Sequence, residues 1–161
     1  MTSIVVESGT GTDPTANSYV SAADLTAYAT ARGITLASDP SQLLIEAMDW
    51  IESLKYQGIK QTKIQPLQFP RYKVWVDGYP LTANTIPQQI KNGQMEAAIA
   101  VDQTTDALQD IPRKTIEEKV GSIEVRYAPN SSSNVYSIKA RNAIWKLLEN
   151  GSANGMRVNK A

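Results

Sequence analysis

The 161-residue sequence contains no cysteine and no histidine. Without a thiol or an imidazole there can be no disulfide, no zinc-finger or zincin site, no cysteine nucleophile and no Ser-His-Asp triad. The carboxylate groupings worth testing for acid–base chemistry or metal binding are Glu46 with Asp49 and Glu52, and Glu117-Glu118. Such spacings are typical of a solvated face. We therefore predict that the chain is not an enzyme and has no catalytic residue, no metal site and no cofactor.

A net charge is also absent, because 16 Lys and Arg residues balance 16 Asp and Glu residues. Strong binders of nucleic acids or anionic membranes usually carry an excess of basic residues. Long apolar runs are missing too: no segment approaches the roughly 20 apolar residues of a membrane span, and the first residues do not read as a signal peptide. We expect a protein that is made in the cytoplasm and has no membrane partner.

The length favours one domain, large enough to bury a core without disulfides or metals. The first segment is rich in small and turn-forming residues, which bury little surface, so we expect a flexible N-terminal arm over 1–16. A single domain follows over 17–150. The last residues, 151–161, are small, polar and basic, and they predict a flexible C-terminal tail that orders on binding.

Apolar periodicity and capping residues predict a mainly α fold. Ser21 and Asp24 form a capping box for the first helix, and Asp39-Pro40 is a typical start for the second. Gly93 lies inside the third helix, where it indicates either a closely approaching neighbour or a weakened helix. The four predicted helices span 21–33, 39–58, 87–105 and 137–150.

Between the second and third helices the helical period disappears, and Pro66, Pro70, Pro80 and Pro87 interrupt the chain. We predict a long proline-rich loop over 59–87, with a short strand at 73–76 before an Asp77-Gly78 turn. Alternating apolar residues predict one or two further strands over 116–127, interrupted at Gly121-Ser122. Because so few strands make no stable sheet alone, we expect them to need a partner such as another copy. The predicted fold is a helical bundle with a small β element.

The order of several short motifs resembles one known family along nearly the whole chain, from Asn17 to Leu148. The matching motifs are Asn17-Ser18-Tyr19-Val20-Ser21, Arg32-Gly33, Ala47-Met48-Asp49-Trp50-Ile51, Gln65-Pro66-Leu67-Gln68-Phe69-Pro70-Arg71, Asp77-Gly78-Tyr79, Ile86-Pro87, Glu96-Ala97-Ala98 and Lys119-Val120-Gly121-Ser122-Ile123-Glu124-Val125. They resemble the head-completion or adaptor proteins of tailed bacteriophages, a family often labelled DnaT-like single-stranded DNA-binding. Phe69 stands where the family commonly has Trp, and the tail beyond Asn150 lies outside the resemblance.

The resemblance implies a structural virion protein at the head-tail interface, assembled in the host cytoplasm. Such an adaptor docks on the portal protein as a homo-oligomeric ring, expected to be twelve-fold. It extends the channel for double-stranded DNA, which passes without sequence-specific binding, and provides a platform for the stopper or tail-completion protein. An extended terminus of the adaptor typically inserts into the portal.

Candidate interface residues come from the aromatic-rich loop, the late strands, the last helix and the tail. They are Phe69, Arg71, Tyr72, Trp75, Tyr79, Ile123, Val125, Tyr127, Trp145, Arg157 and Lys160. Two alternatives stay open for the loop. Its aromatics either anchor it onto the helices or, interleaved with cations such as Arg71 and Lys73, stack on bases as in a single-stranded nucleic-acid-binding module.

Overall fold

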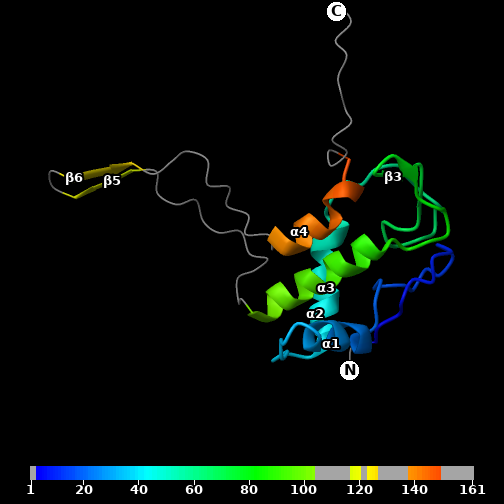
Figure 1. The fold of residues 1–161 in the computed structure, drawn as a ribbon, viewed down its shortest axis with the longest axis horizontal. Coiled ribbons are helices and arrows are strands. Elements are labelled where there is room, and N and C mark those ends of the chain that lie inside the picture. Colours follow the sequence, from blue (N-terminus) through cyan, green and yellow to red (C-terminus); the bar gives the residue numbers. More distant parts are fainter. Residues whose placement is uncertain (1–2, 104–116, 121–122, 127–137, 150–161) are drawn as a thin grey trace, which may run out of the picture.

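The computed structural model describes residues 3–103, 117–120, 123–126 and 138–149. The elements within these ranges are α1 (Ala22–Thr30), α2 (Pro40–Glu52), β1 (Ile59–Lys60), β2 (Arg71–Tyr72), β3 (Trp75–Val76), β4 (Tyr79–Pro80), α3 (Gln88–Gln103), β5 (Glu117–Val120), β6 (Ile123–Arg126), α4 (Ile138–Ile144) and the 3₁₀ turn η1 (Trp145–Leu147). Helices dominate and the strands form short antiparallel pairs, which confirms the predicted mainly α fold (Figure 1). No helix in the described ranges is long and apolar enough to cross a membrane.

The core lies where α3 packs against α2 on one side and α4 on the other, with α1 packed on α2. Leu44, Ile51, Ile90 and Ile144 are fully buried there. A Cβ atom added to Gly93 would lie only 2.2 Å from Cγ2 of Ile144. Of the two explanations predicted for Gly93, a closely approaching neighbour is therefore the correct one, and that neighbour is α4.

The predicted helix starts are correct and two of the predicted ends are wrong. The Ser21 and Asp24 capping box is formed, and the Asp39 side chain caps α2. The second helix ends at Glu52 instead of Gly58, because the chain turns away so that Tyr56 pairs with Leu148 in an antiparallel bridge. The last helix changes to a 3₁₀ turn after Ile144 and so ends before the predicted position.

Residues 3–16, for which we predicted a flexible arm, are held on the fold instead. Val6 forms a parallel bridge with Ser18, and the Glu7 side chain is 3% exposed. The Glu7 carboxylate accepts hydrogen bonds from the backbone N–H groups of Gly9 (2.9 Å) and Gly11 (3.0 Å). A buried carboxylate that binds the loop's own amide groups gives this polar segment a fixed path that composition does not reveal.

The predicted proline-rich loop contains two short antiparallel pairs, of which only β3 had been expected. In the first pair Ile59 faces Tyr72 and in the second Val76 faces Tyr79. The predicted Asp77-Gly78 turn is confirmed: both residues have positive φ angles, 53° and 85°, as a type I′ hairpin turn requires.

The late strands β5 and β6 form one antiparallel hairpin, in which Glu117 faces Arg126 and Val120 faces Ile123. The predicted interruption at Gly121-Ser122 lies outside the described residues. In the described part of the chain each of these strands has one neighbouring strand, the other member of the hairpin. The expectation that another copy completes this sheet stays a prediction.

Candidate partner-binding surface

Residues 53–87, which connect α2 to α3, fold around the two short strand pairs, and we call this region the β lobe. Figure 1 places β3 and α1 at opposite ends of the helices. The lobe also touches the last turn of the fold, since β3 contacts η1. The side chain of Gln57 links the two, because its Nε2 donates to the Lys146 carbonyl (2.8 Å) and its Oε1 accepts from the Trp75 N–H (3.3 Å).

Arg71, predicted as an interface residue, holds the lobe together from inside. Its guanidinium donates to the carbonyl oxygens of Gln57 (2.7 Å) and Gly58 (2.7 Å) and to the Gln68 Oε1 (2.8 Å). These bonds tie the start of the lobe to β2. Because the donors are directed at the chain's own oxygens, Arg71 is not a free cation for a phosphate group.

Phe69, the second predicted interface residue in this stretch, is a core residue. Its side chain is 1% exposed and packs edge-on against Tyr56, with ring centroids 5.3 Å apart and planes at 82°. Its backbone N–H donates to the Tyr19 hydroxyl (3.1 Å). The interpretation that aromatics anchor the segment onto the helices is therefore correct for Phe69.

A half-buried carboxylate supports this anchor. Glu52 Oε1 accepts from the Tyr19 hydroxyl (2.9 Å) and the Gln68 N–H (3.0 Å). Burial raises the pKa of Glu52, against the lowering effect of the hydrogen bonds from Gln68 and Tyr19. Burial, followed by the nearby Glu52, raises the pKa of Tyr19 well above its ordinary value. Glu52 is thus a structural hydrogen-bond acceptor under the lobe, and the sequence pattern that grouped it with Glu46 and Asp49 did not reveal this role.

Other predicted residues do face solvent. Exposed fractions are 41% for Tyr72, 51% for Trp75, 76% for Tyr79 and 41% for Trp145. Trp75 and Tyr79 lie on the two strands of the β3–β4 hairpin, and Trp145 lies on η1, which β3 contacts. These four predicted residues are therefore available to a partner.

Sequence reasoning missed two further members of this surface, Ile59 (57% exposed) and Ile64 (60% exposed). Eight large hydrophobic side chains are exposed in the described part of the chain, and six of them lie on the β lobe or on η1 beside it. Nothing in the local pattern distinguishes Ile59 from a core isoleucine. Apolar groups concentrated in this way mark an interaction surface.

The β lobe is also basic, although the whole chain is neutral. Residues 53–87 contain five basic residues and one acidic residue, a net charge of +4. Lys60, Lys63 and Lys73 are exposed, and none of them has a carboxylate partner in the residues that the structure describes. The acidic residue, Asp77, pairs with Lys146 (2.8 Å). An aromatic surface with unpaired lysines suits an acidic partner.

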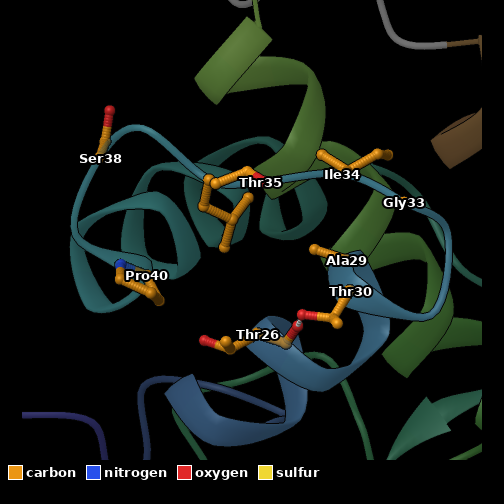
Figure 2. A pocket seen from close by; sticks show the side chains of 9 residues that line it. Thr26, Ala29, Thr30, Gly33, Ile34, Thr35, Ser38 and Pro40 are labelled. Atoms are coloured by element: carbon orange, nitrogen blue, oxygen red, sulfur yellow. Dashed lines mark hydrogen bonds between the residues drawn. The ribbon is translucent and has the colours of Figure 1, made fainter.

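A hollow lies at the opposite end of the fold, between the end of α1 and the start of α2. Its volume is about 370 Å³. Its lining residues are all uncharged: Thr26, Ala29, Thr30, Gly33, Ile34, Thr35, Leu36, Ser38 and Pro40. Figure 2 shows these side chains grouped around an open space bounded by the two helices and the segment between them. Asp102 fixes that segment by accepting from the N–H groups of Ala37 and Ser38, each at 2.9 Å.

The remaining predicted residues cannot be placed as side chains. Ile123 and Val125 belong to β6, of which the structure describes the backbone pairing. Tyr127, Arg157 and Lys160 lie outside the described residues. Within the described residues no group of three or more Asp or Glu residues is arranged to hold a metal ion.

A family model described as "Putative DnaT-like ssDNA binding protein" matches residues 2–161, and so includes the tail that the resemblance did not reach. No curated protein and no solved structure matches the chain. The chain therefore belongs to this DnaT-like family.

Proposed function

We propose that this family member is a structural virion protein, a head-to-tail adaptor that docks on the portal protein as a ring. The ring is expected to be twelve-fold, extends the channel for double-stranded DNA and provides a platform for the stopper or tail-completion protein. It assembles in the host cytoplasm and remains at the head-tail interface of the virion. In this proposal the protein is not an enzyme and has no membrane partner.

The observation that carries the proposal is the concentration of exposed apolar side chains on the β lobe and η1. Tyr79 is 76% exposed, Ile64 60% and Trp75 51%. A protein that acts alone gains nothing from leaving such groups in water, whereas an assembly protein buries them against its partner. The β5–β6 hairpin adds support, because unpaired strand edges are templates for another chain.

The overall charge fits the same role. Sixteen basic and sixteen acidic residues give no net attraction for a polyanion. A protein around a DNA channel benefits from this balance, because DNA has to pass without being gripped. The proposed contact of Arg157 and Lys160 with the portal rests on the resemblance to adaptors whose extended terminus inserts there.

The test mixes the purified full-length protein with purified portal protein and images the product by electron microscopy. We expect a ring on the portal for the wild type and for Ile138→Ala, a control that removes an exposed apolar residue outside the β lobe. Trp75→Ala combined with Tyr79→Ala is expected to abolish the ring while circular dichroism stays unchanged. Absence of a ring with the wild type, or a normal ring with the double variant, contradicts the proposal.

Single-stranded nucleic-acid binding is the second candidate, favoured by the family description and by two exposed aromatics, Tyr72 and Trp75, on either side of Lys73. Base stacking on aromatics with nearby cations is how such binding works. Since Arg71 is engaged internally, Lys73 and its neighbouring lysines would contact the phosphates. A gel shift with an oligodeoxythymidylate across a salt series tests this candidate. A shift near physiological salt that is lost in a Trp75→Ala, Lys73→Ala variant supports it, and no shift removes it.

A further inference from the structure

We propose that the ring is closed by head-to-tail contacts in which the basic β lobe of one copy docks on the acidic α1–α2 region of the next. This inference rests on the proposed function, since it names the partner of the exposed β-lobe surface as a second copy of the same chain. It is carried by the separation of charge along the fold, by the position of the exposed aromatics and by the hollow at the opposite end.

The zero net charge conceals two oppositely charged regions. Residues 20–51, which include α1 and nearly all of α2, contain four acidic residues and one arginine, a net charge of −3; Glu52 is left out because its carboxylate bonds to Gln68 of the β lobe. Residues 53–87 form the β lobe with a net charge of +4. The two values are opposite in sign and similar in size, so a contact between these regions of two copies neutralises most of the charge on both. Complementary potentials of this kind steer association and select the orientation of partners.

Exposed charged groups are present on both regions. Lys63 and Lys73 on the β lobe face solvent, as do Glu46 and Asp49 on α2. Glu46 lies in the middle of α2 and Asp49 in its last turn, and because they are three residues apart they share the exposed face of that helix. None of the four side chains forms an ion pair within the residues that the structure describes. All four are free to pair with groups on another copy.

The apolar groups fit the same arrangement. Trp75 and Tyr79 project from the β3–β4 hairpin, and the uncharged hollow of about 370 Å³ lies at the α1–α2 end. In Figure 2 the Thr26, Thr30 and Ile34 side chains border this hollow. A hollow that offers apolar walls and hydroxyl groups suits the insertion of an aromatic side chain. Asp102 holds one wall in place before a partner arrives, so the receptor is preformed.

The position of the two surfaces determines the type of assembly. Because β3 and α1 lie at opposite ends of the helices (Figure 1), copies that dock end to end use the two surfaces on two different neighbours. Contacts between different surfaces are heterologous and produce a closed ring when the rotation between copies closes, as the proposed adaptor requires.

A charge-reversal experiment tests the contact in the full-length protein. One variant carries Lys63→Glu and Lys73→Glu, which reverses charge on the β lobe. The other carries Glu46→Lys and Asp49→Lys, which reverses charge on α2. Each variant alone brings like charges together. In an equal mixture, opposite charges return wherever the two variants alternate, because the altered lobe of one meets the altered α2 of the other and their unaltered surfaces also meet.

Self-association is measured by sedimentation velocity over a protein concentration series at low salt, with circular dichroism as the folding control. We expect the wild type to associate reversibly, and association to weaken about tenfold between 50 and 500 mM NaCl because salt screens exposed charges. Each variant alone is expected to associate at least about tenfold more weakly than the wild type, and the mixture to recover the wild-type level.

Three results would overturn the inference: a wild type that stays monomeric at low salt, variants that associate normally, or a mixture that does not recover. A fourth result would also overturn it: only the lysine variant is impaired, and the wild type assembles only when single-stranded DNA is added. In that case the lobe contacts nucleic acid instead. Portal imaging separates this inference from the proposed function. Rings on the portal with both variants contradict the charge contact alone, whereas recovery in the mixture without any portal ring contradicts the adaptor role alone.

Discussion

At the scale of single residues, the contrast between Arg71 and Lys73 shows how a charged side chain acquires its role. Both lie in the same aromatic-rich stretch, where either is a candidate for contact with phosphate. The guanidinium of Arg71 is satisfied by oxygens of Gln57, Gly58 and Gln68, whereas Lys73 is exposed. The planar fork of arginine suits several fixed acceptors at once, and a lysine ammonium group on a flexible stem does not.

Replacing Arg71 with lysine should therefore affect stability. We expect Arg71→Lys to lower the free energy of unfolding by about 1–3 kcal/mol, because several carbonyl oxygens lose charge-assisted hydrogen bonds. Lys73→Ala, its control, should change stability by no more than about 0.5 kcal/mol. Urea unfolding followed by circular dichroism measures both. Equal effects of the two substitutions would contradict the internal role of Arg71.

Glu52 gives a prediction about pH. Burial raises its pKa in the folded protein above the ordinary value of 4.5. A raised carboxyl pKa stabilises the fold below the pKa of the unfolded chain, and this contribution is lost as pH rises through the higher folded pKa. Glu52→Gln keeps the acceptor oxygen without the charge, so the stability of the wild type relative to this variant should fall from about pH 4 toward neutral. Urea unfolding across this range, with exposed Glu46→Gln as the control, checks the slope. Parallel profiles for wild type and Glu52→Gln would rule out the effect.

At the scale of elements, helix starts are local features and helix ends are not. Ser21 with Asp24 and Asp39 with Pro40 supply the caps of α1 and α2 within a few residues of sequence. The end of α2 at Glu52 depends on the pairing of Tyr56 with Leu148, which is 92 residues later. A contact over that separation leaves no local pattern, which is why the prediction placed the end at Gly58.

The close contact between α3 and α4 is testable at its tightest point. Gly93→Ala should destabilise the fold by about 1–3 kcal/mol from overpacking, reduced by up to about 1 kcal/mol of gained helix propensity. Ile144→Leu removes the Cγ2 methyl group that the new Cβ would meet at 2.2 Å. The double variant should therefore lose less free energy of unfolding than the sum of the two single losses. A double-mutant cycle measured by urea unfolding gives this difference. Additive effects would show that Gly93 does not face Ile144.

At the scale of the whole molecule, the fold divides one aromatic segment between interior and surface. Phe69 is 1% exposed and Tyr79 is 76% exposed, although they are ten residues apart. Phe69 packs in the core against Tyr56, while the type I′ turn carries Tyr79 away from the core. The same division separates the charges, so that a neutral chain has a basic lobe and an acidic α1–α2 region.

This division predicts opposite consequences for two aromatic substitutions. Phe69→Ala should cost about 3–5 kcal/mol of stability because it leaves a cavity beside Tyr56. Tyr79→Ser should cost no more than about 0.5 kcal/mol, since water already surrounds most of the ring. Thermal and urea unfolding of both variants measure these losses of stability. A large loss with Tyr79→Ser would mean that this ring supports the fold and is not reserved for a partner.

The sequence by itself determined the mainly α class, the caps of the first two helices, the Asp77-Gly78 turn and the exclusion of thiol and imidazole chemistry, because each depends on residue type or on neighbours within one or two turns. Only the tertiary structure decided which loop aromatics are buried, that Arg71 acts internally and that Glu7 fixes the N-terminal segment. These properties arise from contacts between residues far apart in the sequence, whose partners no local pattern specifies.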